Sequence, residues 1–118
     1  MRRVNGETII THLFVYGTLA PGRPNQHVLA KVEGHWQPAS VKGRLEQSGW
    51  GAELGYPGLV LDDSAGEVSG FLFTAEGLAE QWPMLDEFEG SGYQRCITQA
   101  TLANGEQVDC YVYALSQP

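Results

Sequence analysis

An apolar stripe that ends in an acid is the most informative pattern along the chain. The stripe runs in steps of four, three and four residues through Leu78, Trp82, Leu85 and Glu89. Because this spacing is that of one helix face, we predict a helix over 76–88, kinked or restarted at Pro83, with Asp86 and Glu87 pointing to water. An acid at a position that should be buried is disfavoured unless something uses it or satisfies it. Glu89 is therefore the first candidate for chemistry.

Short runs of β-branched and aromatic residues predict strands on both sides of this helix. The expected strands are 9–16, 36–46, 59–61, 67–74, 93–102 and 107–115. The first has the composition of a buried central strand, and the second should be bent or at a sheet edge because it holds Pro38 and Gly43. A further short helix is expected at 25–32 and a mobile loop at 47–58. Together these elements predict an α+β fold, a small mixed, mainly antiparallel β-barrel or curled sheet with two short helices.

The last two strands should form a hairpin. Asn104-Gly105 between them is typical of a two-residue turn, which would pair Ala103 with Glu106. This register places Cys96 opposite Tyr113, and it puts Cys96 and Cys110 on opposite faces of the sheet. We therefore expect free thiols, as in a reducing compartment.

The same register predicts which side chains of the hairpin point inward. The more apolar face would carry Ile97, Val108, Cys110, Val112 and Ala114. Tyr93 and Arg95 have the parity of Ile97, so they should point inward too, close to Glu89, which lies four residues before Tyr93. Two interpretations of Arg95 remain open at this point: it binds a substrate, or it neutralises Glu89 as a structural ion pair.

Tyr16-Gly17-Thr18-Leu19, at the end of the first strand, is the second candidate element. Glycine there allows a sharp turn and a close approach to a ligand, and successive free N–H groups in such a turn can bind an anion. The plainer alternative is an ordinary turn that ends a strand.

Composition narrows the function classes. The 118 residues carry a formal net charge of −7, and the few basic residues are scattered rather than clustered, which argues against nucleic acid as a partner. No run approaches the ~18 apolar residues of a membrane span, and no signal-peptide core is present. We expect a cytoplasmic protein, a monomer or weak homodimer, with one domain over 9–118 behind a loose leader at 1–8. Its histidines lack metal-ligand spacing, so no metal is expected.

Three motifs in order resemble the gamma-glutamylcyclotransferase-like family, which includes small AIG2-like and YtfP-like proteins. Residues 14–25 are similar to its opening signature with Tyr-Gly-(Ser/Thr)-Leu, and residues 55–60 to its Tyr-Pro segment. The run 85–90, with Tyr93 and Arg95, resembles its Leu-Asp-x-x-Glu-Gly…Tyr-x-Arg signature. The similarity extends over about residues 12–115, nearly the whole chain.

The resemblance implies a barrel-like α+β fold and an enzyme that needs neither metal nor cofactor. Family enzymes convert a γ-glutamyl amine or dipeptide to 5-oxoproline and release the amine. The family's catalytic glutamate falls on Glu89, as general acid and base, with its pocket at Tyr16, Gly17, Thr18 and Leu19. From their predicted positions, Tyr93 and Arg95 are further candidates for substrate binding. The alternatives are a non-catalytic domain that binds an anionic amino-acid-like metabolite, or another amide-processing reaction on the same scaffold. The leaving amine stays unspecified.

Overall fold

The computed structural model describes residues 11–16, 33–46, 58–90 and 92–115. Its elements are β1 (His12–Val15), β2 (His35–Glu46), β3 (Gly58–Leu61), β4 (Glu67–Thr74), the 3-10 helix η3 (Glu76–Glu80), α1 (Trp82–Glu89), β5 (Tyr93–Leu102) and β6 (Gln107–Leu115). The predicted ranges of β2 to β6 are confirmed to within one residue. The predicted leader at 1–8, the helix at 25–32 and all but the last residue of the 47–58 loop lie outside the described residues.

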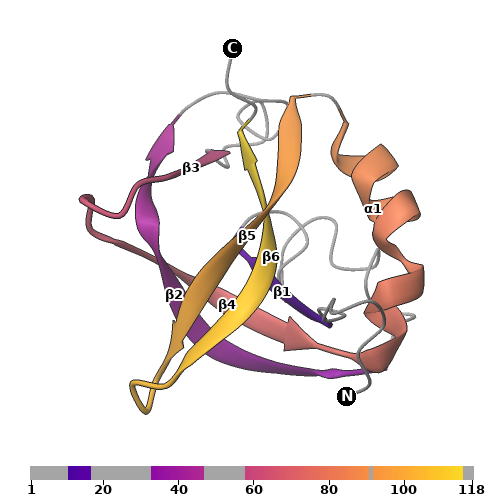
Figure 1. Cartoon of the computed structure of the whole chain (residues 1–118), viewed down its shortest axis with the longest axis horizontal. Coiled ribbons are helices and arrows are strands. Elements are labelled where there is room, and N and C mark those ends of the chain that lie inside the picture. The colour runs from indigo at the N-terminus through magenta and orange to yellow at the C-terminus, as the bar shows by residue number, and fades with distance from the viewer. Residues whose placement is uncertain (1–10, 17–32, 47–57, 91, 116–118) are drawn as a thin grey trace, which may run out of the picture.

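Five strands close into a barrel in the order β2-β4-β1-β6-β5, and β5 returns to β2 through the pairs Ala39–Leu102 and Ser40–Thr101 (Figure 1). Strand β1 runs parallel to β6, and the other neighbours run antiparallel. Strand β3 extends the sheet from the far end of β2. The predicted α+β fold with a mixed, mainly antiparallel barrel is confirmed.

Strand β2 is the long curved strand of the barrel, visible as the magenta ribbon (Figure 1). It pairs with β4 over its first eight residues, from His35 to Lys42, and then with β3 from Gly43 onward. Of the two predicted alternatives, the bent strand is confirmed. At the exchange of partners, a Cβ on Gly43 would lie 2.6 Å from the carbonyl oxygen of Val60, so glycine permits the close approach of the two backbones.

Two apolar clusters lie on the two sides of the barrel wall. The interior holds Phe14, Ala39, Val41, Leu59, Val68, Leu72, Ala100, Cys110 and Val112. The cluster between the wall and the helices holds Leu13, Val15, Phe73, Ala75, Leu78, Trp82, Leu85 and Tyr113. Strand β1 contributes alternate residues to both clusters, which explains why its sequence is apolar on both faces.

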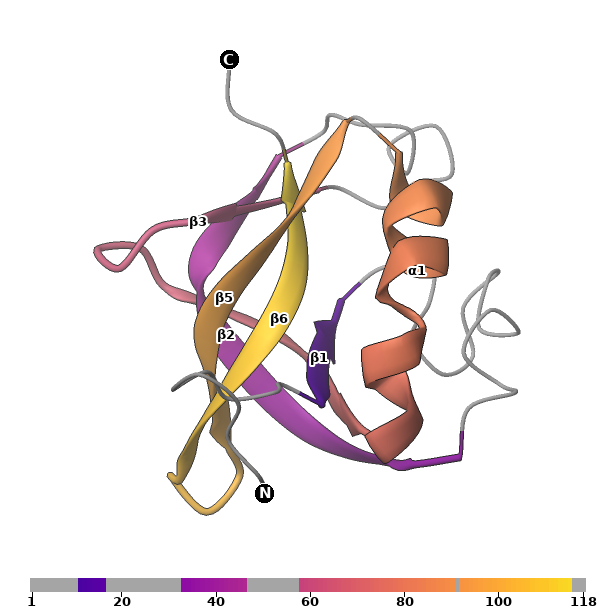
Figure 2. The same cartoon turned by 45° about the vertical axis from the view of Figure 1, so that its right-hand side comes forward.

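The helical segment runs along the outside of the barrel, beside β1 (Figure 2). All four residues of the predicted stripe are buried. The predicted restart is confirmed as well, because η3 ends at Glu80 and α1 begins at Trp82, with Pro83 in its first turn. Proline is tolerated there because that N–H has no partner within the helix. None of the helices in the described residues is long and apolar enough to cross a membrane.

The β5–β6 hairpin has a three-residue loop, not the predicted two-residue turn. Leu102 donates its N–H to the carbonyl oxygen of Glu106 at 2.8 Å, and Gly105 donates to the carbonyl of Leu102 at 2.9 Å. Gly105 has a φ of 88°. These are the features of a type I turn followed by a left-handed glycine. Asn104-Gly105 thus belongs to the longer of two common hairpin loops, and the predicted register is wrong by one residue.

The shifted register exchanges partners along both strands. Cys96 lies opposite Val112, and Arg95 opposite Tyr113. Cys96 and Cys110 therefore have the same parity and face the interior, contrary to the prediction, and both are free thiols. Tyr93, Arg95 and Ile97 face away from the interior, so the prediction that Tyr93 and Arg95 point inward is also wrong.

Candidate active site

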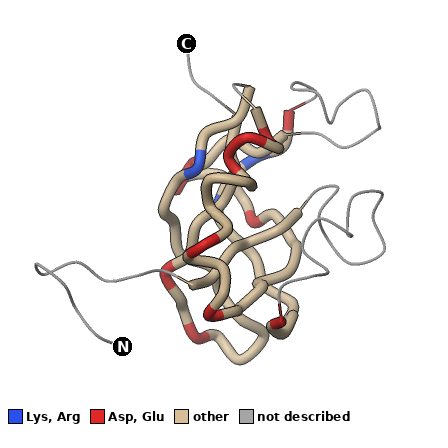
Figure 3. The backbone as a smooth tube through the Cα atoms, turned by 90° about the vertical axis from the view of Figure 1, so that its right-hand side faces the viewer, with Lys and Arg blue, Asp and Glu red and all other residues tan. Residues whose placement is uncertain are grey.

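Glu89 is the last residue of α1 and, among the described residues, the one charged side chain that is buried, with 8% of its surface exposed. Burial raises the pKa of its carboxyl to about 7, because the charged form loses its hydration. Its neighbour Glu87 is exposed, as predicted. Figure 3 faces this side of the molecule and shows acidic positions along the helical segment. A carboxyl with this pKa can both accept and release a proton near neutral pH.

The end of the helix is defined by glycine. Gly90 has a φ of 81° and donates its N–H to the carbonyl oxygen of Asp86 at 3.1 Å. A left-handed residue directly after a helix satisfies a free carbonyl and redirects the chain. Glycine thus allows Glu89 to stand at the very end of the helix, four residues before β5 begins at Tyr93.

Tyr16 lies directly after β1 and joins three strands. Its hydroxyl donates to the carbonyl oxygen of Tyr113 at 2.6 Å and accepts the N–H of Leu59 at 3.0 Å. Burial is the main reason that the pKa of this phenol is raised, and the charge of Glu89 and the phenol of Tyr93 raise it further. The predicted contacts at Gly17, Thr18 and Leu19 lie outside the described residues.

Tyr93 begins β5 and is half-buried against the cluster between wall and helices. The end of α1 and the start of β5 lie at the same end of the molecule (Figure 2). Glu89 and Tyr93 thus lie at the same end of the barrel, and Tyr93 packs on the helix side of the wall rather than on the predicted inner face, whereas the ring of Tyr16 packs against the interior cluster.

Arg95 pairs with Asp86, so the ion-pair interpretation named the wrong acid. Its Nε lies 2.9 Å from Oδ1 and its Nη2 3.2 Å from Oδ2 of Asp86, the two-pronged geometry that arginine forms with carboxylates. The guanidinium also lies 5.0 Å from the ring centroid of Trp82 and 4.5 Å from that of Tyr111, within the range of cation–π contacts. Asp86 was predicted to point to water; it is exposed, but its carboxylate also binds Arg95.

Tyr113 is the residue that sequence reasoning missed. Its hydroxyl donates to Oδ1 of Asp86 at 2.6 Å, and its carbonyl accepts from Tyr16. Burial and the charge of Asp86 raise the pKa of this phenol, and Glu89 adds to the effect. The signal that could have found it is the hairpin register, which sets Tyr113 directly opposite Arg95.

The histidines of the described residues, His12 and His35, lie at the starts of β1 and β2. Nδ1 of His12 lies 2.8 Å from Oγ1 of Thr74, and burial together with nearby His35 lowers the pKa of His12. His35 is exposed. In the part of the chain that the structure describes, no three His, Cys, Asp or Glu side chains are placed to hold a metal ion.

The family model for gamma-glutamyl cyclotransferase, AIG2-like proteins matches residues 13–118. The chain belongs to this family. The match confirms the resemblance of the three motifs and covers every candidate residue described above. No curated protein matches the chain.

Solved structures share the fold. YkqA from Bacillus subtilis is 28% identical with a TM-score of 0.69, over 90% of this chain and 36% of its own. An AIG2-like protein from Mus musculus is 26% identical with a TM-score of 0.71, over 92% of this chain and 79% of its own. A protein from Arabidopsis thaliana is 25% identical with a TM-score of 0.65, over 88% of this chain and 61% of its own. This chain thus spans about a third of YkqA.

Proposed function

We propose that this protein cyclises a γ-glutamyl amine or dipeptide to 5-oxoproline and releases the amine, with Glu89 as the group that moves protons. Membership of the gamma-glutamyl cyclotransferase, AIG2-like family supports the reaction class and a small-molecule substrate. One observation supports the choice of residue: Glu89 is buried at the helix end, and its carboxyl has a pKa of about 7.

The reaction needs little more than proton transfer and a folded substrate. The α-ammonium group loses a proton, and its nitrogen attacks the γ-carbonyl carbon to close the ring. The bond from that carbon to the leaving nitrogen then breaks. The two protons lost by the α-nitrogen end on the released amine, which leaves as an ammonium ion. A single carboxylate can carry a proton from one nitrogen to the other, and the tethered nucleophile needs only the correct conformation.

The surrounding residues have distinct roles in this proposal. Backbone N–H groups of 17–19 would bind the substrate's carboxylate or the developing oxyanion, and Tyr93 would line the site beside Glu89. The hydroxyl hydrogen of Tyr16 is already donated to Tyr113, so Tyr16 acts by fixing where the 17–19 segment begins. Arg95 is engaged with Asp86, and we assign it to holding the helix.

The test is release of 5-oxoproline from a panel of γ-glutamyl amines and dipeptides, measured by mass spectrometry. The wild type should turn over at least one member, and Glu89→Gln should lower kcat by ~10²–10⁴-fold, the usual contribution of a positioned acid–base group. The ionised carboxyl is the form that accepts the first proton, so kcat/KM should rise with pH through about 7.

Glu87→Gln is the matched control, because it removes an exposed carboxyl from the same helix; its kcat should stay within about twofold of the wild type. An active Glu89→Gln enzyme would exclude Glu89 as the proton carrier. Saturable binding of the panel by the wild type without 5-oxoproline release would support the metabolite-binding alternative. Release of a different product would support another amide-processing reaction.

A further inference from the structure

A chain of hydrogen bonds connects the helix that carries Glu89 to the strand that leads into the 17–19 segment. Asp86 accepts from Arg95 of β5 and from the hydroxyl of Tyr113 in β6. The backbone carbonyl of Tyr113 then accepts from Tyr16, whose oxygen accepts in turn from Leu59 of β3. Tyr113 is the shared member, because its side chain contacts the helix and its backbone contacts the strand end.

Asp86 is fixed at both its side chain and its backbone. Its carbonyl oxygen accepts the N–H of Gly90, which closes the helix directly after Glu89. Residues three apart are neighbours on a helix surface, so a shift of Asp86 displaces the turn that carries Glu89. The hydroxyl bond from Tyr113 therefore constrains where that carboxyl sits.

The two acids of this turn lie in opposite environments. Burial opposes the charged form of Asp86, but hydrogen bonds from Tyr113 and Arg95 outweigh it and lower its pKa. Burial raises the pKa of the Glu89 carboxyl. The charge of Glu89 also contributes to the raised pKa values of the phenols of Tyr16, directly after β1, and Tyr113 of β6. Neighbouring acids held in opposite states are a recurrent feature of acid–base sites.

We propose that Asp86 and Tyr113 form a positioning pair, which holds the end of α1 against β6 and keeps the Glu89 carboxyl buried and fixed in place. Neither residue is assigned contact with the substrate. The consequence for catalysis rests on the proposed function, whereas the consequence for the environment of Glu89 does not.

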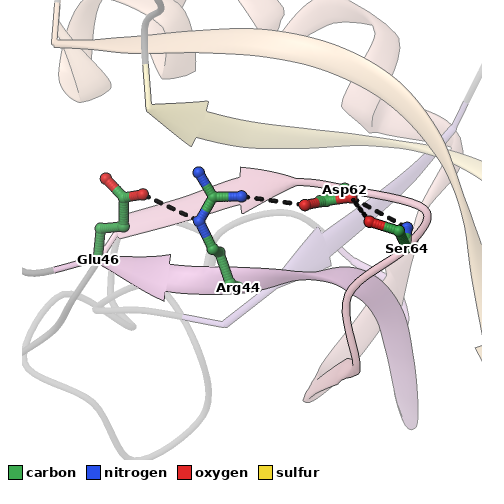
Figure 4. Close-up of polar contacts among 4 residues, drawn as sticks. All are labelled: Arg44, Glu46, Asp62 and Ser64. Atoms are coloured by element: carbon green, nitrogen blue, oxygen red, sulfur yellow. Dashed lines mark hydrogen bonds and ion pairs between the residues drawn. The ribbon is translucent and has the colours of Figure 1, made fainter.

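A comparable ion pair elsewhere in the protein supplies the control. Arg44 of β2 contacts Glu46 at 3.1 Å and Asp62 at 3.1 Å, and Asp62 also accepts from Ser64 (Figure 4). The Arg44 side chain is 52% exposed, against 24% for Arg95. This group joins the end of β2 to the turn after β3, and the ion pairs and hydrogen bonds drawn in Figure 4 involve no residue of α1 or β6, so its loss should weaken only its own surroundings.

The decisive experiment is a cycle of Asp86→Ala, Tyr113→Phe and the double variant, with two readouts. The first is the carboxyl titration of Glu89 by carbon-13 NMR, which requires no turnover. In the wild type its midpoint should lie at about 7. In each variant it should fall by about one unit or more toward the ordinary value, because a loosened helix end admits water.

The second readout is steady-state kinetics. Tyr113→Phe and Asp86→Ala should each lower kcat by about tenfold with KM changed less than about twofold, and the double variant should be no worse than Asp86→Ala alone, because both remove one interaction. Asp86→Asn, which keeps an acceptor for Tyr113, should recover part of the loss, and it serves if Asp86→Ala does not fold. Asp62→Ala should leave kcat within about twofold of the wild type.

The outcomes separate the two proposals. An unchanged Glu89 midpoint in both single variants overturns the positioning pair, whatever the activity. Losses of kcat that multiply in the double variant overturn it as well. A wild type without turnover, combined with the shifted midpoints, removes the proposed function and leaves the positioning of Glu89 supported.

Discussion

The two faces of the β5–β6 hairpin alternate residue by residue, yet they differ in the residues they carry and in what they pack against. The inner face carries Cys96, Ala100, Val108, Cys110 and Val112, which pack in the barrel interior. The outer face carries Tyr93, Arg95, Tyr111 and Tyr113, which meet the helices. The interior is apolar enough for burial to raise the pKa of the Cys110 thiol to about 12. The same two strands thus supply stability on one side and candidate chemistry on the other.

This difference indicates on which side of its wall a small closed barrel can hold a buried acid. Its interior is filled by side chains, and an unpaired carboxylate there would be costly. The outer wall is covered by α1, whose last residue is the buried Glu89, while Asp86 of the same turn reaches Arg95 near the surface. A covering helix therefore provides both the burial and the polar partners that the interior lacks.

The largest expected effect comes from exchanging the characters of the two faces. Val112→Asp puts a charge in the interior, where the side chain is fully buried, and should remove more than ~3 kcal/mol of the free energy of unfolding. Ile97→Asp, on the outer face and 61% exposed, should change it by less than ~0.5 kcal/mol. Urea denaturation measures both. Equal losses would mean that Ile97 points inward, as the two-residue turn predicted.

The sequence predicted the elements better than the faces. Strand bounds, the buried stripe and the restart at Pro83 follow from periodicity and from proline chemistry, which act locally. The faces depend on a single residue in the hairpin loop, since one step in register inverts every side chain. Asn104-Gly105 suits a two-residue turn and also fits the observed three-residue loop, so local composition could not decide the register.

The candidate site was likewise predictable where the signal is local and not where it depends on the pairing of strands. Glu89 was found twice, from the stripe that it completes and from the motif that it shares with the family. The helix pattern predicts Asp86 only as a surface acid, because its partners, Arg95 and Tyr113, come from two strands that only the correct register brings to it. Tyr113 carries no local signal, because a tyrosine in a strand is ordinary. Pairing across elements was the information that the sequence did not contain.

The second prediction concerns stability, because the outer face holds a group that opposes folding. The folded-state pKa of Glu89 is raised from 4.5 to about 7, so between these values the folded protein binds more protons than the unfolded chain. Its stability must therefore fall as pH rises through this window. At pH 8 Glu89→Gln should be more stable than the wild type by about 3 kcal/mol, and at pH 4 the two should be nearly equal.

Urea denaturation at the two pH values measures this difference, with Glu87→Gln as the control for loss of a helical charge. That variant should show less than ~0.5 kcal/mol of change at either pH. A difference for Glu89→Gln that does not depend on pH would contradict the raised pKa. Such a result would also remove the electrostatic support for Glu89 as the proton carrier.

The smallest effect is expected at the loop that fixes the register. A Cβ on Gly105 would meet nothing within 4 Å, yet its φ of 88° lies in the left-handed region. Gly105→Ala should therefore cost ~1–2 kcal/mol from backbone conformation alone. Gly66→Ala is the matched control, because it also has open space around the Cβ but no positive φ, and it should be neutral or slightly stabilising. If both variants behave alike in thermal unfolding, the left-handed glycine does not hold this loop, and the register that separates the two faces must be set by the packing of Ala100, Cys110 and Val112 in the interior.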